Sequence, residues 1–277
     1  MSPDEYCQQK ATQSGSSFYY SFLFLPAERR RAITALYAFC REVDDAVDET
    51  SDEMVARNKL GWWRSEVATM EKGAPTHPVT KALQPHMQTY GLEYGQLQAV
   101  IDGMEMDLNQ TRYLDFVNLK QYCWHVAGVV GLMSARIFGA TRPETMQYAE
   151  KLGLAFQLTN IIRDVGDDAR KGRIYLPVDE LQKYQVKAAD ILNANYSERF
   201  AALMEMQARR AQAVYDEAFA LLPAEDRRAQ RPGLIMASIY RTLLGEIERD
   251  GFHVLNQRIS LTPIRKLWIA WKTYVRG

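Results

Sequence analysis

The sequence predicts an all-α protein with a single domain over residues 1–277, and three observations support this fold class. Good helix formers fill most segments of the chain. Most of the ten prolines stand at the borders between these segments, where helices begin or end. Alternating runs of β-branched residues, which would indicate strands, are scarce. A division into two domains near 170–190 is the alternative.

Helices are expected between these borders, in order along the chain. The segment 165–194 is rich in Gly, Asp, Lys and Arg, so a loop with one short helix is expected there. The predicted helices are 27–50, 52–72, 77–90, 94–108, 115–138, 143–165, 195–222, 231–251 and 262–275.

Composition and charge exclude several classes of protein. The 34 basic and 34 acidic side chains cancel, which gives no support for a nucleic-acid binder that relies on clustered positive charge. No apolar stretch reaches the roughly 18 to 20 residues of a membrane-spanning helix, and no signal peptide is visible. The three cysteines lie far apart and are expected to be reduced, so the chain is predicted to be cytoplasmic.

The predicted helix 27–50 carries acidic residues on its apolar side. Asp44 falls in the middle of the apolar arc, Asp48 lies at its edge and Arg41 lies just outside it. Carboxylates on a core-facing stripe are costly unless they are paired or bind a metal. A frayed acidic helix end in solvent is the alternative. The arc itself consists of Ile33, Leu36, Tyr37, Cys40, Val43 and Val47.

A second polar stripe lies on the predicted helix 143–165. Ala149, Gly153 and Phe156 form a face of mostly small residues, which suggests close approach to a neighbouring helix. The same face then continues as Gln157, Asn160, Asp164 and Asp168. These groups either hydrogen-bond one another in the core or face a polar cavity. Two DxxxD patterns, each accompanied by an arginine (Arg41 or Arg163), favour the cavity.

The DxxxD spacing suits a magnesium–diphosphate site. Carboxylates four residues apart are neighbours on a helix, and two such pairs on facing helices present oxygen ligands across a gap. Mg²⁺ binds through a few carboxylates together with substrate phosphates. The following run 170–173 (Arg-Lys-Gly-Arg) supplies donors for phosphate oxygens. Within it Lys171 is expected to be solvated, and Arg173 is the stronger candidate for a phosphate contact.

Other cofactor chemistries find little support. A di-iron bundle needs Glu-x-x-His on two helices, and none of the four histidines has a Glu three residues before it. Zinc would need His/Cys clusters, which the sequence does not contain. No P-loop or GxGxxG motif is present either.

Over nearly its whole length the chain resembles the squalene and phytoene synthase family, the head-to-head prenyl diphosphate condensing enzymes. The segments 2–45 and 102–116 (DGMEMDLNQTRYLDF) look closest to members of the bacterial hopanoid pathway that form presqualene diphosphate. The matching text is Ser17–Phe18 with the tyrosine-rich segment after it, ALYAFCREVDDAVDE at 35–49, YCWHVAGVVG at 122–131, AFQLTNIIRDVGDDARKGRIYLP at 155–177 and RISLTPIRKLWIAW at 258–271.

This resemblance implies an isoprenoid synthase fold, a helical bundle whose central cavity is lined by both acidic motifs. It implies Mg²⁺ as the cofactor, with Mn²⁺ as a substitute. Some relatives carry a His-Ser pair where this chain has Ser14 and Gly15, so no role is assigned there. By position, the metal and diphosphate residues would be Asp44, Asp48, Asn160, Asp164 and Asp168; the diphosphate-contacting arginines Arg41, Arg163 and Arg173; and the cavity-lining residues Phe18, Tyr122, Gln157 and Tyr240.

The implied reaction condenses two farnesyl diphosphates into presqualene diphosphate and releases one diphosphate. Tyr122 and the four aspartates would be the catalytic residues, and the proton acceptor is either a tyrosine or the released diphosphate. NADPH is not expected, because the closer resemblance is to enzymes that stop at presqualene diphosphate and leave squalene formation to downstream enzymes. Phytoene, squalene or dehydrosqualene synthesis on the same scaffold is one alternative. A non-catalytic subunit that binds prenyl diphosphates is another.

The C-terminal segment 262–277 combines aromatic and basic residues in an amphipathic pattern. Such a helix either lies on the inner face of a membrane as a peripheral contact or docks on its own domain. The residues concerned are Trp268, Ile269, Trp271 and Tyr274, with Arg265, Lys266, Lys272 and Arg276.

Overall fold

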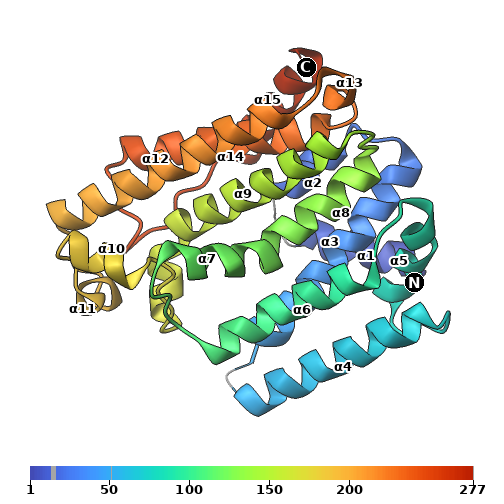
Figure 1. Cartoon of the computed structure of the whole chain (residues 1–277), viewed down its shortest axis with the longest axis horizontal. Helices are drawn as coiled ribbons and strands as arrows, with labels where there is room; N and C mark the ends of the chain where they lie inside the picture. Colours follow the sequence, from blue (N-terminus) through green and yellow to red (C-terminus); the bar gives the residue numbers. More distant parts are fainter. Residues whose placement is uncertain (14–16, 51, 277) are drawn as a thin grey trace.

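The computed structural model describes residues 1–13, 17–50 and 52–276, so Ser14 and Gly15 lie outside the described residues. The all-α prediction is confirmed, because the described residues form a helical bundle without a β-strand (Figure 1). Their one isolated β-bridge joins Arg112 to Ile174. None of the described helices combines the length and apolar character needed to cross a bilayer.

The first half of the chain contains two helices that the sequence analysis did not predict, α1 and α2. Their sequences lack a regular apolar period, and α1 buries only Cys7 and Ala11. The later helices follow the prediction closely: α4, for example, begins after Asp52, whose side chain accepts hydrogen bonds from the first-turn amides. The elements are α1 (Pro3–Gln13), α2 (Phe18–Phe22), α3 (Ala27–Asp48), α4 (Glu53–Glu71), α5 (Pro78–Thr89) and α6 (Tyr94–Asn109).

In the second half, the predicted helix 115–138 contains one wider, π-helical turn, η1. Long helices then form the rest of the bundle, joined by short ones. The elements are α7 (Phe116–Cys123), η1 (Trp124–Gly128), α8 (Val129–Phe138), α9 (Pro143–Arg170), α10 (Val178–Lys183), α11 (Ala188–Leu192), α12 (Glu198–Leu221), α13 (Ala224–Arg227), α14 (Arg231–Arg249) and α15 (Pro263–Arg276).

The prediction was wrong about the segment 165–194. Its first residues continue α9 as far as Arg170, and two short helices, α10 and α11, follow instead of one. The glycine that suggested a loop, Gly166, serves packing, since a Cβ atom there would lie 2.2 Å from the carbonyl oxygen of Leu255. The chain turns only at Gly172, which has a φ of +78°. Both aspartates of the second motif therefore lie on one helix.

Helix α9 occupies the centre of the bundle. It packs against α12 and α14 on one side and against α7, η1 and α8 on the other (Figure 1). The predicted small-residue face makes these contacts close: a Cβ atom on Gly153 would lie 2.5 Å from the carbonyl oxygen of Ala127, and one on Gly131 would lie 2.4 Å from that of Ala149. Two backbones thus meet without side chains between them, which fixes the position of α9.

Replacing Gly153 with alanine should therefore destabilise the fold. The new methyl group collides with backbone that cannot move aside, and overpacking of this kind costs about 1–3 kcal/mol of unfolding free energy. Gly61→Ala is the matched control, because Gly61 lies in the exposed part of α4 and a methyl group added there would have no atom within 4 Å. The control should gain roughly 0.5–1 kcal/mol from helix propensity. Urea unfolding of both variants measures the difference, and equal stability would contradict the packing argument.

Candidate active site

The first acidic pair lies near the end of α3. The apolar arc of this helix packs into the core, with Ile33, Leu36 and Val43 buried. Asp44 and Asp48 follow on the same side, one turn apart, and each side chain is 32% exposed. A frayed helix end in solvent is therefore the wrong interpretation of this motif.

Both carboxylates of this pair have cationic partners. Arg41 Nη1 donates to Asp44 Oδ2 at 2.6 Å. Asp48 accepts from two residues that follow α9, Lys171 Nζ at 2.8 Å and Arg173 Nη1 at 3.0 Å. The predicted Arg173 thus reaches the first motif. Lys171, which was expected to be solvated, does so as well, although its side chain is half-exposed.

The second acidic pair lies on the last two turns of α9. Asp164 is 18% exposed and accepts hydrogen bonds from Arg163 Nε and Arg258 Nε, both at 2.8 Å. Asp168 lies one turn further along. Arg258 precedes α15 and belongs to a segment that carries the family resemblance, but the sequence analysis gave it no role.

The two pairs lie on the walls of one cavity of about 590 Å³. Helix α3 supplies one wall and α9 the other, and cationic side chains lie between them. The structure therefore brings the two motifs together as the sequence analysis expected. The charged residues that line this cavity are Arg41, Asp44, Asp48, Asp107, Arg163, Asp164, Asp167, Asp168, Arg170, Lys171, Arg173 and Arg258.

Asn160 stands where this charged cavity meets the apolar interior. Its side-chain amide donates to Gln157 Oε1 at 3.2 Å. Its oxygen, Oδ1, is buried and has no hydrogen-bond partner among the described residues. An unpaired buried oxygen is costly unless a ligand completes it, so Asn160 is a suitable oxygen donor for a hard cation.

The four carboxylates divide into two electrostatic classes. Burial and the nearby charge of Asp164 raise the pKa of Asp168 to about 7. Burial, only partly offset by Arg41, raises the pKa of Asp44 to about 6. Burial acts in the same direction on Asp48 and Asp164, but their cationic partners outweigh it and hold the pKa of each below its usual value. The least compensated carboxylates are therefore Asp44 and Asp168, one on each wall.

Asp107, a buried carboxylate on α6, was not among the residues predicted from the sequence. It accepts hydrogen bonds from Tyr175 Oη at 2.7 Å and from the predicted Tyr122 Oη at 3.0 Å. The two tyrosine rings stack with centroids 5.2 Å apart, and burial raises the pKa of Asp107 to about 6. The available signal was its position on the apolar face of α6, one turn after Met104.

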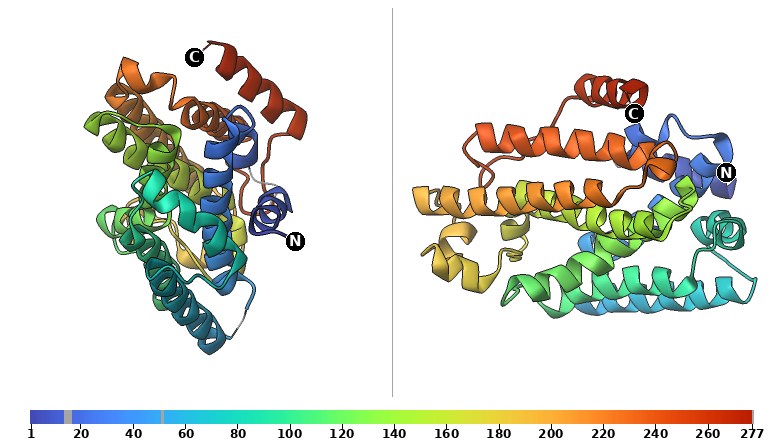
Figure 2. Two further views of the ribbon diagram at one scale, coloured as in Figure 1. Left: turned by 90° about the vertical axis from the view of Figure 1, so that its right-hand side faces the viewer. Right: turned by 45° about the horizontal axis from the view of Figure 1, so that its top comes forward.

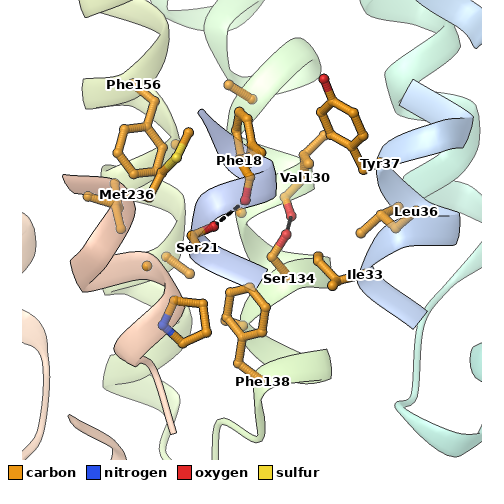
Figure 3. A pocket seen from close by; sticks show the side chains of 18 of the residues that line it. Phe18, Ser21, Ile33, Leu36, Tyr37, Val130, Ser134, Phe138, Phe156 and Met236 are labelled. Atoms are coloured by element: carbon orange, nitrogen blue, oxygen red, sulfur yellow. Dashed lines mark hydrogen bonds between the residues drawn. The ribbon is translucent and has the colours of Figure 1, made fainter. Parts of the chain in front are cut away.

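An apolar pocket of about 180 Å³, called the tunnel below, adjoins the charged cavity. Figure 3 shows this pocket from close by. Gln157 and Asn160 line both the tunnel and the charged cavity. Two serine hydroxyls in the tunnel wall are satisfied locally, because Ser21 donates to the carbonyl of Phe18 at 2.6 Å and Ser134 to that of Val130 at 2.7 Å. The tunnel therefore suits a hydrocarbon chain. Figure 3 labels its walls as Phe18, Ser21, Ile33, Leu36, Tyr37, Val130, Ser134, Phe138, Phe156 and Met236.

The remaining predicted aromatic residues lie at the junction of these spaces. A third cavity of about 460 Å³ shares Asp44, Asn160 and Arg163 with the charged cavity and Phe18 with the tunnel. Tyr240 lines this third cavity. Its ring lies 5.1 Å from that of Phe156, a tunnel residue. Charged and apolar walls thus meet at aromatic faces.

Comparison with known proteins agrees with this geometry. The family model described as squalene/phytoene synthase matches residues 11–265. The phytoene synthase of Arthrospira platensis is 36% identical over 276 residues, covering 95% of this chain and 89% of the relative. The 15-cis-phytoene synthase of Synechocystis sp. is 33% identical, covering 96% of this chain and 84% of the relative.

Two solved structures share the fold closely. A dehydrosqualene synthase crystallised with a ligand superimposes with a TM-score of 0.87 at 28% identity, covering 99% of this chain and 96% of the other. Squalene synthase HpnC from Alicyclobacillus acidocaldarius superimposes with a TM-score of 0.80, also at 28% identity, covering 90% and 94%. The all-α bundle is therefore the isoprenoid synthase fold of these enzymes.

Removing the charge of Asp168 should weaken the pH dependence of stability. Because its pKa is about 7 in the folded chain, against 3.8 for an ordinary aspartate, the folded state binds a proton more tightly than the unfolded state. The free energy of unfolding of the metal-free wild type should therefore fall as the pH rises from about 4 to about 7. Asp168→Asn should reduce that slope.

Urea unfolding of chelator-treated protein across this pH range provides the measurement. Asp102→Asn, at an exposed ion pair with Arg64, is the control. An identical slope in wild type and Asp168→Asn would contradict the assignment.

Substituting Asp107 should affect turnover more than substrate binding. Asp107→Asn removes the charged acceptor that orients Tyr122 and Tyr175, and loss of a supporting carboxylate typically costs about 10-fold to 100-fold in activity. The loss should appear in kcat with little change in KM. Glu105→Gln, on the more exposed side of the same helix, is the control. A kcat within twofold of wild type would contradict a positioning role.

Proposed function

The chain belongs to the squalene/phytoene synthase family and is a prenyltransferase, and from this premise we propose that it condenses two farnesyl diphosphates into presqualene diphosphate. One observation carries the proposal: two aspartate pairs on α3 and α9 face the same cavity, next to an apolar tunnel. The charged cavity suits diphosphate groups and the tunnel suits a prenyl chain. The intact acidic motifs argue against a non-catalytic binding subunit.

We propose Mg²⁺ as the cofactor, with Mn²⁺ as a substitute. The candidate ligands are all oxygens, from Asp44, Asp48, Asn160, Asp164 and Asp168, and the unpartnered oxygen of Asn160 fits this donor set. Within the described part of the chain no three His, Cys, Asp or Glu side chains form a ready-made metal cluster. When bound, such an ion withdraws charge from the diphosphate and makes it a better leaving group.

The cationic side chains are placed to receive the diphosphates. Arg41, Arg163 and Arg173 now pair with aspartates of the two motifs. Arginine binds phosphate oxygens through two parallel hydrogen bonds, so the same side chains can exchange a carboxylate for a phosphate partner. Lys171 and Arg258 extend this set on the α9 side.

The reaction begins when the C–O bond of one farnesyl diphosphate breaks and its diphosphate leaves with the bonding electrons. The C2–C3 double bond of the second molecule attacks the resulting allylic cation. Loss of one proton then closes a cyclopropane and gives presqualene diphosphate. The apolar walls exclude water from the cation, and the faces of Phe18 and Tyr240 stabilise it electrostatically. The proton passes to the released diphosphate or to Tyr122 Oη, which would hand its own proton to Asp107, the carboxylate to which it donates.

Phytoene synthesis from C20 substrates is the second candidate, because the relatives described above include phytoene synthases. The tunnel lining supports the shorter substrate. Phe22 and Phe138 are each only 5% exposed and occupy the wall with bulky rings, which limits the length of a bound chain.

The inferred product retains a diphosphate, so we infer that downstream squalene-forming enzymes consume it.

One set of incubations tests the reaction and its product. Purified protein with Mg²⁺ is given farnesyl diphosphate, with and without NADPH, or the C20 analogue geranylgeranyl diphosphate, and the products are identified by mass. Presqualene diphosphate is expected from farnesyl diphosphate in both conditions. Phytoene from the C20 substrate alone would establish the second candidate, and squalene formed only with NADPH would show that the reaction goes further. No product from any substrate would indicate a binding subunit.

Variants of the two motifs test the site in the same assay. Asp44→Ala and Asp164→Ala should each lose at least about 100-fold in kcat, because each removes a ligand from one wall of the metal site. Asp102→Ala, an exposed carboxylate on α6, should keep wild-type activity. Melting curves by circular dichroism show whether each variant is folded. Full activity in a folded Asp44→Ala or Asp164→Ala variant would sink the metal assignment.

A further inference from the structure

Helix α15 docks on the bundle through one face. Ile269 and Ala270 are buried, and the Tyr274 ring stacks on Phe24 with centroids 4.5 Å apart and an interplanar angle of 17°. The helix packs against α14 and α2. The segment 262–277 was expected either to lie on a membrane or to dock on its own domain. Its inner face docks on its own domain.

The outer face of α15 is apolar and uncovered. Figure 2 shows the helix on the outside of the bundle. Five of the fourteen exposed large hydrophobic residues in the described chain lie on it, at 48% to 83% exposure. Their spacing of three or four residues places them in one stripe along the helix. A contiguous patch of this kind on a folded protein marks an interaction surface. The outer stripe consists of Ile264, Leu267, Trp268, Trp271 and Val275.

The charge around the outer stripe indicates what it contacts. The chain as a whole has no net charge, yet α15 carries four basic residues and no acidic one. One of the four, Arg265, pairs with Glu246 of α14. Lys272 Nζ lies 4.7 Å from the Trp268 ring centroid, at the side of the stripe. Two copies of α15 facing each other would bring like charges together. An anionic surface would instead be attracted, and tryptophans beside basic residues are typical of helices that lie in a lipid interface.

We propose that α15 binds an anionic lipid surface through its outer stripe. The inner face stays on α14, and the stripe enters the headgroup region with Lys272, beside Trp268, toward lipid phosphates. Lys266, in the second turn of α15, lines the third cavity together with Ile259 and Leu261. The lipid would therefore lie beside the cavity in which the apolar product forms, a consequence that rests on the proposed function. The binding itself does not depend on it.

Vesicle co-sedimentation tests this proposal without substrate. Full-length protein is mixed with phosphatidylcholine vesicles, with or without phosphatidylglycerol, at low and at high salt. Wild type should bind only the anionic vesicles and dissociate at high salt. The double variant Trp268→Ser/Trp271→Ser should bind at least about tenfold more weakly, since it removes the two largest apolar contacts. Lys272→Ala should lose about fivefold, since one basic residue near an anionic membrane contributes about that factor.

Trp62→Ser is the matched control, because Trp62 is 46% exposed on α4, away from the outer stripe. It should bind as wild type does. Melting curves identify any variant that fails to fold. If the double variant does not fold, Lys272→Ala and the salt dependence of wild-type binding still test the proposal. Absence of binding to anionic vesicles, or equal binding by folded stripe variants, would overturn the proposal. So would a dimer in light scattering that the stripe variants dissociate, since the stripe would then contact a second copy.

Discussion

The electrostatic repulsion among carboxylates that share a partly buried cavity is the constraint on which the rest of this structure depends. Asp44, Asp48, Asp164 and Asp168 can lie on facing walls only because cationic side chains reach in between them. The compensation is incomplete, since the pKa values of Asp44 and Asp168 stay raised. The folded protein therefore favours a cation between these carboxylates, which the proposed Mg²⁺ would supply.

The packing of α9 fixes where its two carboxylates lie in the cavity. Glycines at the crossing with η1 and α8 let the backbones meet, and Gly166 does the same against Leu255 near the other end of the helix. The helix is thus fixed before the acidic motif, at Gly153, and within it, at Gly166. Its polar stripe faces α3 while the opposite side packs against α12. Close backbone packing at the glycines of α9 thus fixes the positions of its carboxylates relative to α3.

Much of this arrangement was predictable from the chain, and the exceptions have physical causes. Apolar spacing predicted most long helices, and the acidic residues on core-facing stripes predicted a shared cavity. The end of α9 was placed too early, because glycine and charged residues resemble a loop when the packing partner, Leu255, is about ninety residues away. Asp107 was missed because it belongs to no DxxxD pattern. Its partners Tyr122 and Tyr175 come from other segments, so only the folded chain brings the three together.

The π-helical turn η1 has a consequence for how this wall can evolve. In a regular α-helix Tyr122 and Val130 would point about 80° apart, because eight residues exceed two full turns by that angle. One wide turn absorbs about one extra residue and reduces the difference to about 20°. A single helix can thereby present Tyr122 to the charged cavity and Val130 to the tunnel. An insertion or deletion within 124–128 would rotate one half of the wall out of alignment, so we expect this stretch to vary in residue type and not in length.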